Sequence, residues 1–256
     1  MKIAGKVAVI TGAAGGIGLA LARRFKAEGA KGIAIADLQQ GPLQAAAKEL
    51  GALAVACDVT REQDVRNLIA RAEAELGPVD IFVSNAGVYR PGGEATPDAE
   101  WTLNWDTHVM AHVYAARALM PKMVVRGEGY FVVTASAAGL LTHVASASYA
   151  TTKHAAVAFA EYLAVSYGDK GVRISVLCPQ AVRTAMTQNL KNSTSSVDGM
   201  LEPEALGDTV VETMAAERFL ILPHPTVLGY MRSKTSDYDR WLGGMRRLKA
   251  RAAKPV

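Results

Sequence analysis

"VAVITGAAGGIGLALARRF", residues 7–25, places an apolar run, a glycine-rich turn and a helical pattern in direct succession. Gly12, Gly16 and Gly18 fall in the turn, with Ile17 between the last two. Without Cβ atoms the chain can bend sharply, and the backbone N–H groups at a helix start can approach a pyrophosphate. This order of strand, turn and helix predicts a dinucleotide-binding loop formed by these four residues.

An acidic residue ends the next apolar run, "GIAIAD" (32–37). The carboxylate of Asp37 can accept hydrogen bonds from the ribose hydroxyls of an adenosine, and it would repel a 2′-phosphate. Ala13, Ala14 and Leu38 provide no basic side chain for such a phosphate. The loop and its acid therefore predict NAD, rather than NADP, as the cofactor.

Short apolar runs recur along the chain with helical patterns between them. Because the runs are almost continuously apolar, we expect strands that are covered on both faces. The alternation predicts an α/β fold: a Rossmann-type, doubly wound parallel sheet of about seven strands with helices on both faces. We expect one domain over residues 1–256, ending in a C-terminal helical extension (about 224–256). The expected strands are 6–11, 32–37, 52–59, 79–85, 129–136, 172–179 and 218–223.

The composition is that of an ordinary globular chain, with 50% hydrophobic and 20% charged residues in 256. No apolar run reaches the roughly 18 residues of a membrane span, and no secretory signal precedes the first expected strand. We therefore expect a cytoplasmic protein with no membrane partner. Cys57 and Cys178 lie far apart in apolar stretches, which predicts buried free thiols.

The net charge of +4 has its origin at the C-terminus, because residues 231–256 carry eight Lys or Arg and two Asp. This segment lacks the length and the interleaved aromatic residues of a nucleic-acid-binding region. We expect no nucleic-acid partner. The segment is interpreted as a solvated or subunit-facing helix, with binding of an anionic partner as the alternative.

A group of reactive residues lies in "VVTASAAGLLTHVASASYATTKHAAVAF" (132–159). Ser136 ends the fifth expected strand, and Tyr149 and Lys153 share one face of the following helix at i, i+4 spacing. An adjacent ammonium favours the phenolate and lowers the tyrosine pKa from about 10. The pattern predicts Tyr149 as general base for an alcohol proton, Lys153 as its cation, and Ser136 as a hydrogen-bonding partner of the same oxygen.

These motifs, in this order, resemble those of the short-chain dehydrogenase/reductase family over nearly all of residues 5–223. The resemblance implies hydride transfer to or from NAD and a homodimer or homotetramer. The motifs are "TGAAGGIG" (11–18), the acid Asp37, "DV" (58–59), "NAG" (85–87), the serine, "YATTK" (149–153) and "PQAVRT" (179–184).

The resemblance also implies cofactor contacts to the adenine, the adenosine and the nicotinamide. Asp58 and Val59 would contact the adenine, and Asn85, Ala86 and Gly87 would line the adenosine. Val182 and Thr184 would contact the nicotinamide, and Lys153 would hold the nicotinamide ribose. One departure is Gln180, which stands where the family has glycine after Pro179 and puts the local turn in question.

A second departure concerns the family's fourth catalytic residue, an asparagine that holds a water between the lysine and solvent. Counting back from Pro121 in "LMPKM" places His108 at this position, with Asn104 one helical turn earlier as a less favoured alternative. Imidazole can both donate and accept, so we predict that His108 serves in the proton relay. A weakened active site and a purely structural histidine are the alternatives.

His108 and His112 are also spaced so that one helix face could present both rings. Zinc needs three or four protein ligands, and neither cysteine nor a third histidine falls near them in the pattern. We expect no metal site.

The residues together predict an oxidoreductase that transfers a hydride between NAD(H) and a hydrophobic secondary alcohol or ketone, with Tyr149 as general base or acid. The expected substrate contacts are mostly apolar and include no arginine that would clamp a carboxylate. They are Ala138, Leu140, His143 and Met186. Two alternatives are a catalytically impaired NAD(H)-binding sensor or scaffold, which the intact reactive residues disfavour, and an NADP-dependent ketone reductase, which Asp37 disfavours.

Two segments are expected near the substrate. The polar stretch 186–202 is a candidate lid, because it follows the sixth strand at the edge where ligands bind, although an idle surface loop has the same composition. The C-terminal extension is expected either to cover the substrate cleft or to form a subunit interface.

Overall fold

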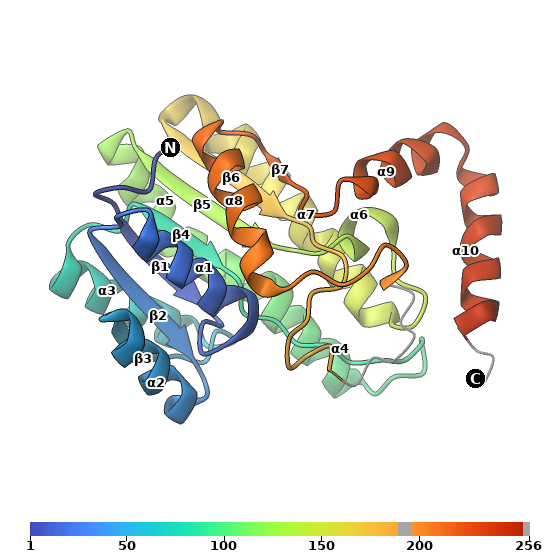
Figure 1. Ribbon diagram of the computed structural model, residues 1–256, viewed down its shortest axis with the longest axis horizontal. Coiled ribbons are helices and arrows are strands. Elements are labelled where there is room, and N and C mark those ends of the chain that lie inside the picture. The colour runs from blue at the N-terminus through green and yellow to red at the C-terminus, as the bar shows by residue number, and fades with distance from the viewer. Residues whose placement is uncertain (189–195, 253–256) are drawn as a thin grey trace.

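The structure, a computed structural model, describes residues 1–188 and 196–252. The strands in this part of the chain are β1 (Val7–Thr11), β2 (Gly32–Asp37), β3 (Leu53–Ala56), β4 (Ile81–Ser84), β5 (Gly129–Thr134), β6 (Val172–Leu177) and β7 (Leu220–Ile221). They form one parallel sheet in the order β3-β2-β1-β4-β5-β6-β7 (Figure 1). The predicted fold class is confirmed, and each strand lies inside the apolar run that predicted it.

Helices cover both faces of the sheet. On one face lie α1 (Gly16–Ala27), α2 (Gln40–Leu50) and α8 (Leu206–Ala215), and on the other lie α3 (Glu62–Leu76), α5 (Ala111–Arg126) and α7 (Ala147–Tyr167). Alternate residues of a strand therefore pack in different cores. Ile81 and Val83 of β4 pack in the first layer, with α1, α2 and α8, while Phe82 packs in the second layer, with α3, α5 and α7. Two apolar faces explain the continuously apolar runs of the sequence.

An aromatic pair joins the two strands at the centre of the sheet. The rings of Phe82 (β4) and Phe131 (β5) are stacked with centroids 5.5 Å apart, and both side chains are fully buried. The segments that follow these strands carry "NAG" and Ser136, so this pair lies beneath both halves of the predicted site.

The strand order reverses at β1, which pairs with β2 on one side and with β4 on the other. At such a reversal, the connections that leave the strands diverge to opposite faces and open a crevice at the carboxyl edge. The segments after β1, β2, β4, β5 and β6 all arrive at this edge, which brings the predicted site residues together.

The predicted C-terminal extension is helical. It comprises α9 (Thr226–Ser236) and α10 (Tyr238–Ala252), and α10 lies at the outer side of the molecule, joined to the rest through α9 (Figure 1). Lys234 of α9 donates to the Leu140 carbonyl at 2.7 Å, and the Asp237 side chain accepts the Arg240 N–H and caps α10. Residues 253–256 of the predicted extension lie outside the described residues.

The predicted lid is described in part, since residues 189–195 lie outside the described residues. Its far end is attached to the extension, because the Asp198 carboxylate accepts hydrogen bonds from Thr226 at 2.9 Å and from Tyr230 at 3.0 Å. The role of 186–202 as a lid stays a prediction, as does a single domain over 1–256.

Cys57 and Cys178 are buried free thiols, as expected. In the described part of the chain, no helix combines the length and the apolar character that crossing a membrane requires.

Truncation of the central aromatic pair tests its contribution to the fold. We expect Phe131→Ala to lower the free energy of unfolding by about 3–5 kcal/mol, because it removes a fully buried ring and leaves a cavity between two helix layers. Chemical denaturation measures the change. The control is Lys48→Ala on α2, whose side chain is exposed. An equal loss in both variants would contradict a central role for the pair.

Candidate active site

The glycine loop leaves no room for side chains at two positions. A Cβ at Gly12, where φ is +64°, would lie 2.7 Å from the Ala86 Cα, and a Cβ at Gly18 would lie 2.3 Å from the Gly12 carbonyl oxygen. The loop is thus drawn against the "NAG" segment and against the start of α1. Gly15, the N-cap of α1, has no side chain to cap the helix, so the first N–H groups of α1 can bind an anion.

Asp37 lies beside this loop at the end of β2. Its carboxylate accepts the Ala14 N–H and the Gln39 N–H, both at 3.1 Å, which hold it at the crevice with lone pairs left for a ribose hydroxyl. The Cys57 N–H donates to the Asp37 carbonyl, so Asp58 and Val59 follow directly at the same edge. The structure therefore brings the predicted adenosine contacts to one place.

Thr11 joins the ends of β1 and β4. Its hydroxyl accepts the Asn85 N–H at 2.9 Å and the Ala86 N–H at 3.2 Å, while the Asn85 amide donates to the Thr11 carbonyl at 2.9 Å. Asn85 and Ala86 therefore link the ends of the two central strands.

The remaining predicted cofactor residues also reach this edge. A Cβ at Gly16 would lie 3.1 Å from the Thr184 side chain, so the segment after β6, which also carries Val182, meets the glycine loop. A Cβ at Gly87 would lie 3.5 Å from His108 Nε2 and 3.8 Å from Lys153 Nζ. Ile17 packs on the first helix layer. Tight backbone packing, an uncapped helix start and a positioned acid together fit a dinucleotide.

The reactive residues come from β5 and α7. Lys153 is 3% exposed, and its Nζ donates to the Thr134 carbonyl at 2.9 Å. This Nζ lies 5.7 Å from the ring centroid of Tyr149, whose hydroxyl also interacts with Ser136. Ser146 caps α7 by accepting the Tyr149 N–H at 3.2 Å, which fixes the first turn of the helix and the tyrosine on it.

The pKa values of the pair differ from the sequence-based expectation, in which Lys153 lowers the pKa of Tyr149. Burial raises the pKa of Tyr149 to about 12, against the opposing hydrogen bond from Ser136. Burial lowers the pKa of Lys153 to about 8. Loss of water is therefore the dominant effect on Tyr149, and the neutral phenol is the stable form at neutral pH.

Three further rings surround Tyr149. Tyr89, His108 and His143 contact it edge-on, with centroids 5.3, 5.4 and 5.8 Å from its own. Edge-to-face contacts on several sides restrict rotation of the phenol and fix the direction of its hydroxyl.

His108 lies in a π-helical turn, Asp106–Met110, that joins α4 (Asp98–Trp105) to α5. Such a turn inserts a residue into the helical register and commonly occurs at functional sites. It directs His108 toward Tyr149. Asn104, the alternative, is buried one turn earlier with its amide donating to the Glu100 carbonyl at 2.8 Å.

The ring of His108 uses both nitrogens. Nε2 accepts the Val88 N–H at 3.1 Å, so in the neutral ring Nδ1 carries the proton and donates to the Thr152 hydroxyl at 2.9 Å. Thr152 donates onward to the Ser148 carbonyl at 2.8 Å. Burial, followed by the charge of Lys153, holds the pKa of His108 well below its usual range. The ring is therefore neutral and fixed in one tautomer.

His112 has a partner of its own. Its Nδ1 lies 2.6 Å from the Ser84 hydroxyl, and burial lowers its pKa to about 3. The two histidines thus bind different groups. Among the described residues, no three His, Cys, Asp or Glu side chains form a group that could hold a metal ion.

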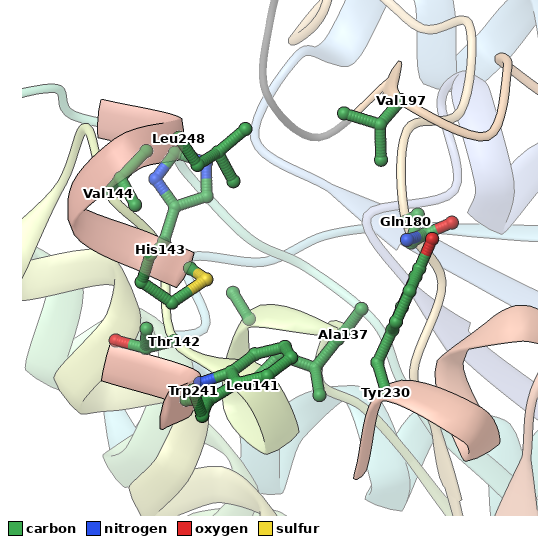
Figure 2. A pocket seen from close by; sticks show the side chains of 12 residues that line it. Ala137, Leu141, Thr142, His143, Val144, Gln180, Val197, Tyr230, Trp241 and Leu248 are labelled. Carbon is green, nitrogen blue, oxygen red and sulfur yellow. The ribbon is translucent and has the colours of Figure 1, made fainter. Parts of the chain in front are cut away.

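A cavity of about 360 Å³ begins at the residue that follows Ser136 in the chain, and Figure 2 shows the side chains that line it. His143 connects the cavity to the reactive residues, since it contacts the Tyr149 ring and lines the cavity. The lining comes from the segment after Ser136, from the segments after β6, and from α9 and α10. It consists of Ala137, Ala138, Leu141, Thr142, His143, Val144, Gln180, Val197, Tyr230, Trp241, Met245 and Leu248.

Two of the four predicted substrate contacts, Ala138 and His143, line this cavity. Leu140 instead offers its carbonyl to Lys234, and Met186 is 42% exposed; their contact with substrate stays a prediction. Sequence reasoning missed the contribution of α10 to the lining. The signal for it was the apolar i, i+4, i+7 spacing at positions 241, 245 and 248 within a basic helix.

Two backbone features shape the cavity. Thr142 has φ +82° and ψ 174°, a conformation almost confined to glycine, and the resulting turn presents His143 next to it. At Gln180, by contrast, φ is not positive, because Thr142 and Glu217 are the non-glycine residues with positive φ in the described chain. The turn after β6 therefore needs no glycine there, which answers the question raised by the sequence.

Comparison with known proteins agrees with this geometry. The family model described as short chain dehydrogenase matches residues 6–195. A 1-deoxy-11-beta-hydroxypentalenate dehydrogenase from Streptomyces exfoliatus is 34% identical, over 94% of this chain and 90% of the relative.

Two solved structures are similar over most of their length. A short chain dehydrogenase/reductase from Burkholderia phymatum in complex with NAD has a TM-score of 0.85 at 30% identity, covering 93% of this chain and 96% of the other. A 3-ketoacyl-(acyl-carrier-protein) reductase from Brucella melitensis, complexed with NADH, has a TM-score of 0.80 at 28% identity, covering 87% and 98%. The site contains a glycine loop that can hold a dinucleotide, which we call the cradle (residues 12–18), and a reactive group of Ser136, Tyr149 and Lys153. Together with these matches, it shows that the chain belongs to the short-chain dehydrogenase/reductase family.

Proposed function

We propose that the protein is an NAD-dependent dehydrogenase that oxidises hydrophobic secondary alcohols, and reduces the corresponding ketones in the reverse direction. The observation that carries the proposal is the position of Tyr149. Its phenol interacts with Ser136, lies near the buried ammonium of Lys153, and meets an apolar cavity through His143. This is the arrangement that removal of a hydroxyl proton requires.

NAD is the proposed cofactor. Asp37 would accept the ribose hydroxyls of the adenosine and repel a 2′-phosphate. The bound NAD and NADH in the Burkholderia and Brucella structures support this choice. When bound, NAD supplies the acceptor for the hydride that leaves the carbinol carbon. Gly12, Gly16, Ile17 and Gly18 would hold its pyrophosphate, and Asp58, Val59, Asn85, Ala86, Gly87, Val182, Thr184 and Lys153 would make the other contacts.

Tyr149 and Ser136 act on the substrate oxygen in this proposal. Ser136 donates a hydrogen bond to it, which positions the carbinol, and Tyr149 Oη takes the hydroxyl proton. Because burial favours the neutral phenol, Tyr149 must first release its own proton to solvent water before it can act as a base. Lys153 stabilises the phenolate once it forms.

For His108 the hydrogen bonds support a positioning role within the proposed relay. The ring ties Val88, after "NAG", to Thr152, beside Lys153, so it holds together the two segments that flank the reacting groups. The sequence left three roles open for His108: service in the proton relay, a weakened active site and a purely structural ring. Because the ring is neutral and both nitrogens are occupied, we propose a role between the first and the third, in which His108 holds the geometry of the relay.

We also propose that the protein works as a cytoplasmic homodimer or homotetramer. The support within this chain is a set of exposed apolar side chains on α5 and α7: Val125 at 88%, Tyr162 at 63% and Val165 at 86%. Exposed apolar side chains on neighbouring helices of one layer are typical of a subunit contact.

The first test is NADH formation from apolar secondary alcohols, with Tyr149→Phe beside the native protein. We expect the variant to lose at least about 100-fold in kcat, because phenylalanine cannot accept a proton, while its affinity for NADH is unchanged. Tyr167→Phe, at the far end of the same helix, should keep full activity. Native protein that binds NADH without turnover would favour the sensor or scaffold alternative.

The second test concerns cofactor choice. We expect Asp37→Ser to lower the preference for NAD over NADP by at least about tenfold, because the repulsion of a 2′-phosphate is removed. The ratio of kcat/KM values for the two cofactors measures it. Asp169→Ser, at an exposed acid far from the loop, is the control. An unchanged preference in Asp37→Ser would contradict the role proposed for this carboxylate.

The third test separates positioning from proton transfer by His108. We expect His108→Asn to lower kcat about tenfold, since a shorter amide cannot reach both Val88 and Thr152, without changing the slope of kcat against pH from about 6 to about 8. The slope should persist because the buried imidazole stays neutral over that range. His154→Asn is the control. If the plot of kcat against pH shows a change near the usual histidine pKa, and this change disappears in His108→Asn, the ring would instead lie in the proton path.

A further inference from the structure

α10 has two distinct faces. Trp241, Met245 and Leu248 form one apolar stripe that lines the cavity. The basic side chains of the helix are exposed, at Arg240, Arg246, Arg247, Lys249 and Arg251. An amphipathic helix places its apolar face where it can be removed from water, and here this face is turned to the cavity.

The stripe also touches the segment that follows Ser136. Trp241 packs against an apolar cluster that includes Ala137 and Leu141. Figure 2 shows Trp241 and Leu248 on one side of the cavity, with Tyr230 and Gln180 on the opposite side. A molecule held between these sides would touch α10, and it would also meet His143, whose ring contacts Tyr149.

The cavity offers no charge to an anionic substrate. None of its described lining residues is Lys, Arg, Asp or Glu, and burial lowers the pKa of His143, which keeps this ring neutral. A carboxylate taken into such a space would lose its hydration without gaining a cation. In size the cavity lies at the small end of ligand sites, which span roughly 300–1,000 Å³.

We infer that α10 is the outer wall of the substrate site and that Trp241 is a specificity-determining residue, which selects neutral alcohols with an apolar body large enough to reach this wall. The inference rests on the proposed function. It also separates this chain from the Streptomyces relative, whose name denotes action on a carboxylate, hydroxypentalenate.

Probe binding tests the wall without turnover. The probes are N-phenyl-1-naphthylamine, which is neutral, and 8-anilinonaphthalene-1-sulfonate, which has nearly the same rings with a negative charge. We expect the native protein to bind the neutral probe at least about tenfold more tightly than the sulfonate, and Trp241→Ala to weaken the neutral probe by about tenfold. Met245→Ala, from the same stripe, should weaken it severalfold.

Leu242→Ala is the matched control, because Leu242 is the next residue of the helix, is 42% exposed and does not line the cavity. This variant should bind the neutral probe as the native protein does. Thermal melting identifies any variant that does not fold, and Met245→Ala then carries the comparison. Equal affinity in Trp241→Ala, Met245→Ala and Leu242→Ala, or equal affinity for the two probes, would overturn the inference.

Turnover with NAD separates this inference from the proposed function. Cyclohexanol needs the reacting groups but reaches little of the wall, whereas 2-decalol has a second ring. We expect Trp241→Ala to lower kcat/KM for 2-decalol about tenfold more than for cyclohexanol. If Trp241→Ala oxidises both alcohols with no such difference, the proposed dehydrogenase activity is supported and the role of α10 as a wall of the substrate site is contradicted. Probe binding that follows the stripe, without oxidation of either alcohol, would uphold the wall and contradict the dehydrogenase.

Discussion

The buried ammonium of Lys153 is the constraint on which the rest of the site depends. It is 3% exposed and has the Thr134 carbonyl, at the end of β5, as its hydrogen-bond acceptor. A cation removed from water is tolerated only where its surroundings are polar and free of other positive charge. His108 and His112 meet this condition, because burial and the charge of Lys153 lower the pKa of both rings. Burial is the larger cause and the charge of Lys153 the smaller one, so both histidines stay neutral beside the buried ammonium.

The tyrosine shows how burial and charge compete in this site. The ammonium favours a phenolate, but the same protein atoms that orient the ring also exclude the water that would solvate it. Tyr89, His108 and His143 contact the ring edge-on, and the pKa of Tyr149 is raised to about 12. The packing that orients the phenol therefore also raises its pKa, which makes the phenolate harder to form. A pair of residues at i, i+4 spacing is not by itself an activated base.

Features that depend on local pattern could be predicted from the sequence. Continuously apolar runs located the strands, and the spacing of glycines after β1 located the cradle, because both express short-range geometry. The partners of His108 could not be predicted, since they depend on a π-helical turn that changes which side chains face inward. Nor could the cavity, where Trp241 meets Ala137 and Leu141 from a distant part of the chain. The prediction that Lys153 lowers the pKa of Tyr149 was wrong for the same reason, because burial of the phenol is a property of the whole fold.

The attachment of α10 outside the two helix layers has a consequence for how such a protein diversifies. The helix connects to the rest through α9, and its residues are not part of either layer that packs on the sheet. Substitutions in it can accumulate, and insertions can be tolerated, without disturbing the strands that carry the cradle and the reactive group. Gene duplication followed by drift in one terminal helix would then yield paralogues with the same chemistry and different substrates.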